Sequence, residues 1–478
     1  MAARLTGCPS IPGNYHGTMT QVPPHLAVVG TILQTPTADQ LEVLTNVVVS
    51  VRADGVILGV HPAGSAPGAA AVATATNIRV LRAGERLLPG LIDTHLHAPQ
   101  WPQLGSGVDL PLEQWLFDHT FPLEARYVDG EFAQRVWDDM VPCLLAHGTT
   151  TAVYYSSIHE EATFRLASTC ARFGQRAFVG RVAMDHPEGT PDWYRDTDAS
   201  AAMASTVRSI EAINSLADPL GLVRPIITPR FVPACSDALL HGLGELAAAT
   251  GVLVQTHCSE SDWEHHHVLD RFGHSDTAAL HRFGLLREGT VLAHGNHMAD
   301  DDFDRARDVA AGVAHCPLSN SYFANAVFPV RRALDRGVRL GLGTDVAGGC
   351  HPGLLPQCVN AVTSSRMFED GVDPRVPANG RGVGGSRFDT VTAFHLATVG
   401  GAQMLGLPCG LLAPGRMFDA FVVDPGRRQS SLRIWDELDD EARVFEKIVR
   451  LTSPTDITSV WVAGRQVSES GHTILGGQ

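Results

Sequence analysis

Two histidines separated by one residue, His95 and His97, end an apolar stretch of the chain and could bind one metal ion together. Alternate side chains of a strand point to the same face, so both imidazoles can reach the same ion. Asp93 lies on that face too, two residues before His95. A His-x-His pair is a weak sign in a chain with 22 histidines. Other parts of the sequence must therefore supply further ligands.

Three further polar groups close strand-like runs later in the chain. They are His257 with Glu260 three residues on, His294 in Ala-His-Gly, and Asp345 in Gly-Leu-Gly-Thr-Asp. Imidazoles with a carboxylate are the ligand set of a catalytic zinc ion, which keeps one position for water and lowers its pKa. Glu260 could then move protons, and Asp345 could orient or deprotonate the water. Any one of these histidines alone is more typical of a hydrogen-bonded core residue, but the ordered set favours a metal site.

Strand-like runs between about 90 and 405 would position these groups, and most are followed by room for a helix. The runs are Leu91–Thr94, Gly148–Tyr155, Ala177–Val182, Pro225–Pro229, Val252–His257, Val291–His294, Gly312–His315 and Arg339–Gly343. Alternating β and α segments predict a parallel sheet, and eight units favour a closed (β/α)8 barrel. The polar groups would then share the mouth at which barrel enzymes keep their chemistry.

Short β-rich runs also lie at both ends of the chain. They are Leu26–Leu33, Asn46–Val51, Val56–Val60, Ile78–Leu81, Phe418–Asp424, Lys447–Thr452 and Ile457–Val467, and turn-forming residues fill 61–75. We expect both ends to join into one small composite β-sandwich domain. The predicted organisation is an irregular arm at 1–23, the first part of the sandwich at 24–88, the barrel at 89–408, and the second part with a tail at 409–478.

Composition excludes several classes of function. The 36 basic and 51 acidic residues give a formal charge of −15, which argues against nucleic acid as a partner. Nine cysteines without a Cys-x-x-Cys pair indicate reduced thiols in the cytoplasm. Neither an export signal nor an apolar run of about 18 residues occurs, so we expect no membrane insertion.

Five segments resemble the amidohydrolase superfamily: Pro89–Gln100, His257–Glu260, Ala293–Gly295, His315–Asn320 and Gly341–Gly349. Within it, further segments are similar to the guanine deaminase family: Gly105–Leu112, Phe121–Glu124, His147–Thr151, Phe173–Gly180 and Thr228–Phe231. The resemblance is dense over roughly 80–410 and loose in the flanking β regions.

The resemblance implies a zinc enzyme that deaminates guanine to xanthine and ammonia in purine catabolism, as a homodimer. By it, the zinc ligands would be His95, His97, His257 and Asp345. His294 would lie beside the bound water, and Glu260 would protonate the ring nitrogen next to the attacked carbon. One zinc ion per subunit is expected, because two-metal versions of such sites often use a carboxylated lysine as a bridge, and the single lysine, Lys447, lies beyond the barrel.

A flat neutral purine needs fixed hydrogen-bonding groups and a stacking face. Gln100 has an amide with both hydrogen-bonding roles, and Arg230 has fixed donors suited to a ring carbonyl and ring nitrogen. Phe231 could supply the stacking face, although a core role is equally compatible with its sequence context, and His257 would also touch the substrate. Trp101 and His159 are further candidates for the pocket, and both stay open.

Other readings of the sequence remain. A related deaminase or dechlorinase could act on an oxidised guanine, an adenosine-type nucleoside or a triazine, and a barrel without metal could be a scaffold. Gln100 with Arg230 favours guanine, and the complete ligand set disfavours the scaffold. His186-Pro-Glu188 fits part of a cytidine-deaminase zinc motif, but no Pro-Cys-x-x-Cys accompanies it. The three histidines at 265–267 are expected on a solvated helix, and 371–387 could be a lid or a surface loop.

Overall fold

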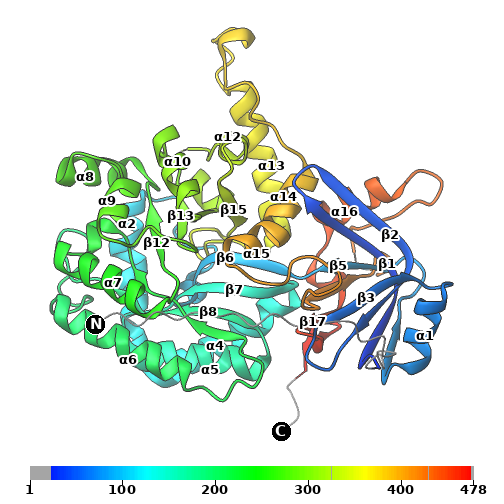
Figure 1. The fold of residues 1–478 in the computed structure, drawn as a ribbon. Coiled ribbons are helices and arrows are strands. Elements are labelled where there is room, and N and C mark those ends of the chain that lie inside the picture. The colour runs from blue at the N-terminus through cyan, green and yellow to red at the C-terminus, as the bar shows by residue number, and fades with distance from the viewer. Residues whose placement is uncertain (1–22, 325, 429, 475–478) are drawn as a thin grey trace, which may run out of the picture.

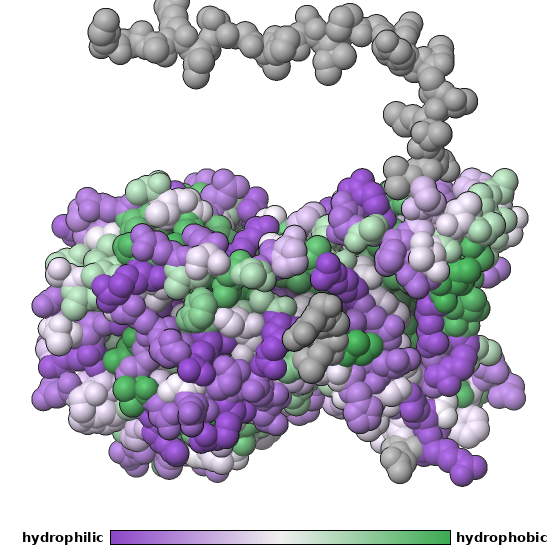
Figure 2. Space-filling model, turned by 90° about the horizontal axis from the view of Figure 1, so that it is seen from below, coloured by the Kyte–Doolittle hydropathy of each residue, from purple (hydrophilic) through white to green (hydrophobic). Residues whose placement is uncertain are grey.

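The computed structural model describes residues 23–324, 326–428 and 430–474. Except for residue 23, the predicted arm at 1–23 lies outside this part of the chain. Figure 1 shows two units, a barrel surrounded by helices and a smaller β unit in which the first and last parts of the chain lie side by side. Seen from below, they form a larger and a smaller lobe whose surfaces mix hydrophilic and hydrophobic residues (Figure 2).

Eight parallel strands form the barrel. They are β6 (Leu91–His97), β7 (Thr149–Tyr155), β8 (Arg176–Gly180), β10 (Val223–Pro225), β12 (Gln255–Cys258), β13 (Val291–His294), β14 (Gly312–His315) and β15 (Arg339–Leu342). Their order is β10-β8-β7-β6-β15-β14-β13-β12, and a parallel bridge between Ile227 and Val254 joins the two edges. The short strands β9 (Val182–Ala183) and β11 (Thr228–Pro229) pair beside them. The predicted (β/α)8 barrel is confirmed.

Helices cover the outside of the barrel and its mouth. They are α2 (Leu112–Trp115), α3 (Phe121–Ala125), α4 (Gly130–Ala146), α5 (Glu160–Phe173), α6 (Ala199–Asn214), α7 (Asp237–Thr250), α8 (Asp262–Phe272), α9 (Asp276–Arg282), α10 (Asp300–Asp308), α11 (Pro317–Ser319), α12 (Val330–Asp335), α13 (Leu354–Asp370), α14 (Thr390–His395) and α15 (Gly401–Met404). Helix α4 shows why such segments fold locally. The Asp129 side chain caps its first turn, and Ala133, Trp137, Met140 and Leu144 recur at helical spacing on its buried face.

Strands from both ends of the chain form one mixed sheet, which confirms the composite β unit. Its strands are β1 (Leu26–Thr37), β2 (Gln40–Val51), β3 (Ile57–Pro62), β4 (Asn77–Val80), β5 (Arg86–Pro89), β16 (Ala420–Val423), β17 (Ile457–Val462), β18 (Arg465–Glu469) and β19 (His472–Thr473). The two ends meet where β5 pairs antiparallel with β16, and β5 leads directly into the first barrel strand. The predicted domain boundaries stay predictions.

Two local predictions at the ends of the chain are wrong. The supposed turn-forming stretch 61–75 contains helix α1 (Ala66–Thr74), whose N-terminus is capped by the Ser65 hydroxyl. The supposed strand Lys447–Thr452 is the last part of helix α16 (Glu441–Leu451), which buries an apolar face at helical spacing. The predicted run Ile457–Val467 is a pair of antiparallel strands, β17 and β18.

A buried ion pair holds the barrel against the composite sheet. Arg176, at the start of β8, donates to both carboxylate oxygens of Asp419 over 3.1–3.2 Å, and Asp419 also accepts from the Ala463 N–H at 2.7 Å. These atoms lie at the N-terminal end of the strand, opposite the mouth where β8 ends. The pair therefore links the two units at the end of the barrel away from its mouth.

Among the described residues, no helix is both long enough and apolar enough to span a membrane. The segment after α13 extends away from the body of the molecule (Figure 1). It contains the exposed side chains Val372, Val376 and Val383. This arrangement favours a surface loop over a lid for 371–387.

Candidate active site at the barrel mouth

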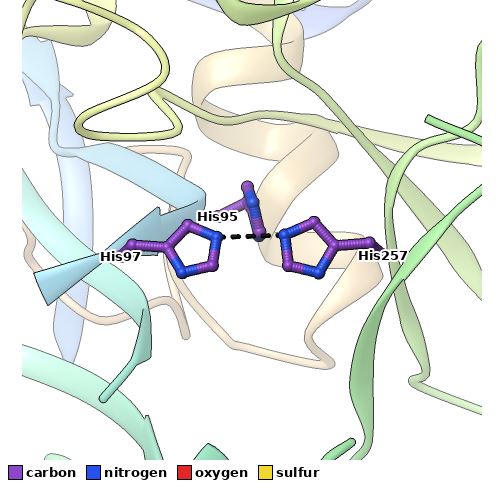
Figure 3. Close-up of side chains that lie close together, drawn as sticks. All are labelled: His95, His97 and His257. Atoms are coloured by element: carbon purple, nitrogen blue, oxygen red, sulfur yellow. Dashed lines mark hydrogen bonds between the residues drawn. The ribbon is translucent and has the colours of Figure 1, made fainter. Parts of the chain in front are cut away.

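The predicted ligands meet at the C-terminal ends of the barrel strands. His95 and His97 lie on β6, His257 on β12 and His294 at the end of β13, while Asp345 follows β15. Figure 3 shows the rings of His95, His97 and His257 converging from two strands. Sequence separations of up to 250 residues are bridged here because all parallel strands of a barrel end at one rim.

The distances among these side chains are those of a metal centre. The Nε2 atoms of His97 and His257 lie 3.0 Å apart, and Oδ1 of Asp345 lies 3.1 Å from His95 Nε2 and 3.7 Å from His97 Nε2. Four ligands around zinc at about 2.0–2.1 Å would place neighbouring nitrogens about 3.3 Å apart. The spacing of the ligand atoms therefore fits one ion.

Hydrogen bonding supports the same interpretation. His257 Nδ1 donates to the carbonyl oxygen of Arg230 at 2.6 Å, so its Nε2 carries a free electron pair. Both ring nitrogens of the buried His95 have no hydrogen-bond partner in the structure. Buried polar atoms without partners are costly, and a cation bound by one nitrogen of His95 would remove part of that cost. The residues present fit a divalent metal ion.

Burial keeps the ligands in the neutral form that binds metal. It lowers the pKa values of His95, His97 and His257, and the neighbouring imidazoles lower them further. Cys316 lies near His95 and His294, but burial raises the pKa of its thiol, so it is a poor ligand at neutral pH. The histidines form a buried cluster that could hold a metal ion, and Asp345 lies beside it.

Asp93 supports this cluster from behind. Its carboxylate accepts from the hydroxyl and the N–H of Thr344 at 2.5 and 3.0 Å, and from the His95 N–H at 3.2 Å. Burial raises the pKa of Asp93 to about 7. Asp345 has a positive φ of 48°, a strained conformation that neighbouring contacts must hold in place. Asp93 therefore fixes the backbone that carries Asp345.

Glu260 and His294 stand beside the cluster. Glu260 Oε1 lies 3.6 Å from His294 Nε2, and burial together with the charge of Asp345 raises the pKa of Glu260 well above its ordinary value. A carboxyl group that stays protonated at neutral pH can donate a proton. His294 Nδ1 donates to the side-chain oxygen of Asn320 at 2.9 Å, which leaves its Nε2 electron pair facing the site.

A cavity opens onto the cluster. It is lined by His97, Gln100, Leu112, Trp115, Leu116, Arg230, Phe231, His257, Glu260, Phe323, Asp345 and Gly348. The structure thus brings the predicted Gln100, Arg230 and Phe231 together with the cluster. The ring of Phe231 stands edge-on to that of His257, with centroids 6.2 Å apart, and both rings face the cavity.

Sequence reasoning missed the apolar roof of this cavity and a carboxylate behind it. Trp115 packs against Phe323 at 4.9 Å between ring centroids, and both come from short helical segments above the barrel. Glu124 is buried behind Gln100 and Arg230 and pairs with both. The family-like segment Phe121–Glu124 was the available signal for it.

Two open candidates lie away from the cavity wall. Trp101 is partly buried, and its indole N–H donates to Asp139 at 2.7 Å. His159 lies beside Tyr194, with ring centroids 6.0 Å apart. Within the described part of the chain, the clusters of potential ligands all lie at the barrel mouth, and His186 and Glu188 belong to none of them.

Comparison with known proteins agrees with this geometry. The model of the amidohydrolase family matches residues 86–467. The chain is 37% identical over 396 residues to a probable guanine deaminase of Schizosaccharomyces pombe, covering 82% of this chain and 73% of the relative. It is 35% identical over 389 residues to the guanine deaminase of Dictyostelium discoideum, covering 80% and 82%.

A solved structure extends the comparison to three dimensions. Guanine deaminase from C. acetobutylicum, with guanine bound in its active site, superposes with a TM-score of 0.82 at 27% identity. The match covers 92% of this chain and 99% of that chain. The chain therefore belongs to the amidohydrolase family and, within it, to the guanine deaminases.

Proposed function

We propose that the protein hydrolyses guanine to xanthine and ammonia. The observation that carries the proposal is one cavity in which Gln100, Arg230 and Phe231 face a buried histidine cluster, the adjacent Asp345 and the acid Glu260. The relatives named as guanine deaminases support the same substrate, and one of them binds guanine in its active site. The expected setting is purine catabolism.

The metal in the proposal is one zinc ion per subunit, held by His95, His97, His257 and Asp345. Imidazoles and a carboxylate at these distances suit zinc, and cysteine ligation is disfavoured by the protonated Cys316. When bound, such an ion lowers the pKa of a water molecule and stabilises negative charge on oxygen.

The side chains around the cluster would move the protons. Asp345 accepts a proton from the attacking water, while the free Nε2 electron pair of His294 orients that water. Glu260, kept protonated by burial, donates to N3 of the purine. A C–O bond forms at C2 and the C–N bond to the amino group breaks. One proton of the water passes through Asp345 to the departing ammonia, and the other replaces the proton that Glu260 gave to N3.

The cavity wall would hold the flat ring in place. Arg230 and Gln100 supply donors for the purine carbonyl and a ring nitrogen, and Phe231 supplies a face. The apolar roof of Trp115 and Phe323 excludes water above the ring. Holding the reacting carbon near the activated water makes the attack effectively intramolecular. This positioning supplies a large share of the rate enhancement.

We further propose that two copies assemble as a homodimer and that the protein works in the cytoplasm. The homodimer follows from the family resemblance. The cytoplasm is supported by the eight cysteines in the described part of the chain, all of which are free thiols.

A panel of substrates tests the proposal. Zinc-loaded protein would be incubated with guanine, adenine, 8-oxoguanine, guanosine and a chlorotriazine, and ammonia and ultraviolet spectra would be followed. We expect conversion of guanine above all others. Turnover confined to another heterocycle would overturn the roles of Gln100 and Arg230, and inactivity of the zinc-loaded protein on all five would favour a scaffold.

A further inference from the structure

Glu124 lies behind the substrate cavity and does not line it. This side chain belongs to helix α3 and is completely buried. Its carboxylate accepts from Arg230 Nη1 at 2.6 Å, from Arg230 Nη2 at 3.1 Å and from Gln100 Nε2 at 3.0 Å. One carboxylate thus holds both of the polar side chains assigned to guanine recognition.

The amide of Gln100 is fixed at both ends. Its Oε1 accepts from the Ala347 N–H at 3.1 Å, and its Nε2 donates to Glu124. In the flipped orientation, the amide oxygen would face the carboxylate and the NH2 group would face the Ala347 N–H. Both contacts would then be repulsive in a buried site. Because a carboxylate can only accept, Glu124 makes the orientation of this amide unambiguous.

Arg230 is fixed in a similar way. Its guanidinium lies 4.8 Å from the centre of the Phe121 ring, and Glu124 takes up one edge of it in a bidentate pair. Burial alone would lower the pKa of Arg230, but the facing carboxylate raises it above its ordinary value, so the group stays charged. Its remaining N–H groups are available to the cavity, as is one N–H of Gln100.

The resulting wall presents hydrogen-bond donors. A purine edge with a carbonyl at C6 and a ring nitrogen carries acceptors and matches this wall. An edge with an amino group at C6 would place donors against donors, and a site built around fixed polar groups rejects such a mismatch strongly. The groups that recognise C6 therefore depend on a residue that touches no substrate.

We propose that Glu124 is a positioning residue that makes this wall donor-only and thereby selects 6-oxopurines over 6-aminopurines. The proposal rests on the proposed function, since it specifies how the same cavity discriminates among purines. A purely structural role, in which Glu124 only neutralises Arg230, would affect stability without changing this preference.

The test compares guanine with 2,6-diaminopurine, which keeps the amino group at C2 and replaces the carbonyl at C6. Changing Glu124 to Gln gives position 124 both a donor and an acceptor, so the Ala347 N–H alone still favours the present orientation of the Gln100 amide, and Arg230 loses its charged partner. For Glu124→Gln we expect the ratio of kcat/KM for guanine over 2,6-diaminopurine to fall at least about tenfold, mainly through a higher KM for guanine. Glu124→Asp keeps an acceptor-only side chain, so its ratio should stay within about threefold of the wild-type ratio, even if its activity is lower.

Asp419→Asn is the matched control. It disrupts another buried bidentate pair with arginine, at the opposite end of the barrel. This variant should lower thermal stability as Glu124→Gln does and leave the substrate ratio unchanged. An unchanged ratio in Glu124→Gln, with guanine still deaminated, would overturn the proposal. If Glu124→Gln does not fold, Gln100→Leu replaces it, because removing the oriented amide must reduce the ratio as well.

Binding without turnover separates this proposal from the proposed reaction. Hypoxanthine has the C6 carbonyl and no amino group at C2, and adenine has the C6 amino group. Calorimetric titration should show that the wild-type protein prefers hypoxanthine and that Glu124→Gln loses this preference. That result in a protein without guanine turnover would support the role of Glu124 and refute the reaction. Equal binding of both purines by the wild type would refute the role of Glu124.

Discussion

Replacing Asn320 with aspartate should move the acidic side of the activity profile to higher pH. Asn320 accepts from His294 Nδ1 at 2.9 Å, and burial lowers the pKa of His294, so its ring is neutral in the proposed mechanism. A carboxylate of nearly the same shape in place of the amide would stabilise the imidazolium. His294 would then become protonated at a higher pH and lose the electron pair that orients the water.

The size of this shift can be estimated from the geometry. Unit charges about 4 Å apart interact by about 4 kcal/mol at an effective dielectric constant near 20, which sets an upper limit of about three pKa units. Nearby carboxylates commonly shift a pKa by about 1–3 units. We therefore expect the acidic limb of the pH profile of kcat/KM to move to higher pH by about one to two units in Asn320→Asp. Activity should recover at alkaline pH.

The assay is the initial rate of guanine loss between pH 5 and 9 with the zinc-loaded enzyme. Asn320→Ala is the matched variant, because it removes the hydrogen bond and adds no charge. Loss of such a supporting partner typically lowers activity by about 10–100-fold. The acidic limb of the pH profile should not move to higher pH in this variant. If the limbs of both variants and the wild type coincide, a neutral His294 is not required, and its proposed role is wrong.

Three further predictions test other parts of the structure. His97→Ala should no longer bind stoichiometric zinc in elemental analysis, and a chelator should not lower the melting temperature of this variant. Retained zinc would contradict the assigned ligand set. Asp276 is buried beside Ser259, and burial raises its pKa to about 7, so the folded state binds a proton that the unfolded state releases above about pH 4. The contribution of Asp276 to stability should therefore fall as the pH rises from 4 to 7. In calorimetry, Asp276→Asn should gain on the order of 1–3 kcal/mol relative to wild type between pH 5 and 8, whereas a constant difference would contradict the shift. Asp419→Asn leaves Arg176 buried with a weaker partner and should reduce the free energy of unfolding by about 3 kcal/mol in denaturant titrations with kcat unchanged; an unaffected stability would show that the pair does not hold the two units together.

The barrel and the metal cluster could be predicted from sequence because their signal is local. Each ligand directly follows or ends an apolar strand, and parallel strands of a barrel end at a common rim. Once the strands at 91–97, 255–258 and 291–294 were recognised, the meeting of His97, His257 and His294 followed from topology alone.

Helix α16 shows where a short window misleads. Residues 447–452 contain a run of β-favouring side chains, which suggests a strand. The buried positions of the whole segment are Val444, Phe445, Ile448 and Val449, a spacing that belongs to a helix face. Tertiary packing of that face against the body of the protein overrides the local preference.

Glu124 could not be assigned a role from its local sequence. Its partners lie 24 and 106 residues away, and a buried carboxylate among apolar neighbours has no local pattern that reveals them. The same holds for the roof of the cavity, since Trp115 and Phe323 are typical core residues by type. Contacts of this kind depend on how loops fold over the barrel mouth, which periodicity does not determine.

The most direct test of the central claim is the origin of the new oxygen in the product. Zinc-loaded protein would convert guanine in water enriched in oxygen-18, and the purine product would be analysed by mass spectrometry. We predict xanthine that carries one oxygen-18 atom at C2, with one ammonia released per xanthine, and neither product with Glu260→Gln. Absence of xanthine, or xanthine without the label, would contradict hydrolysis at this site.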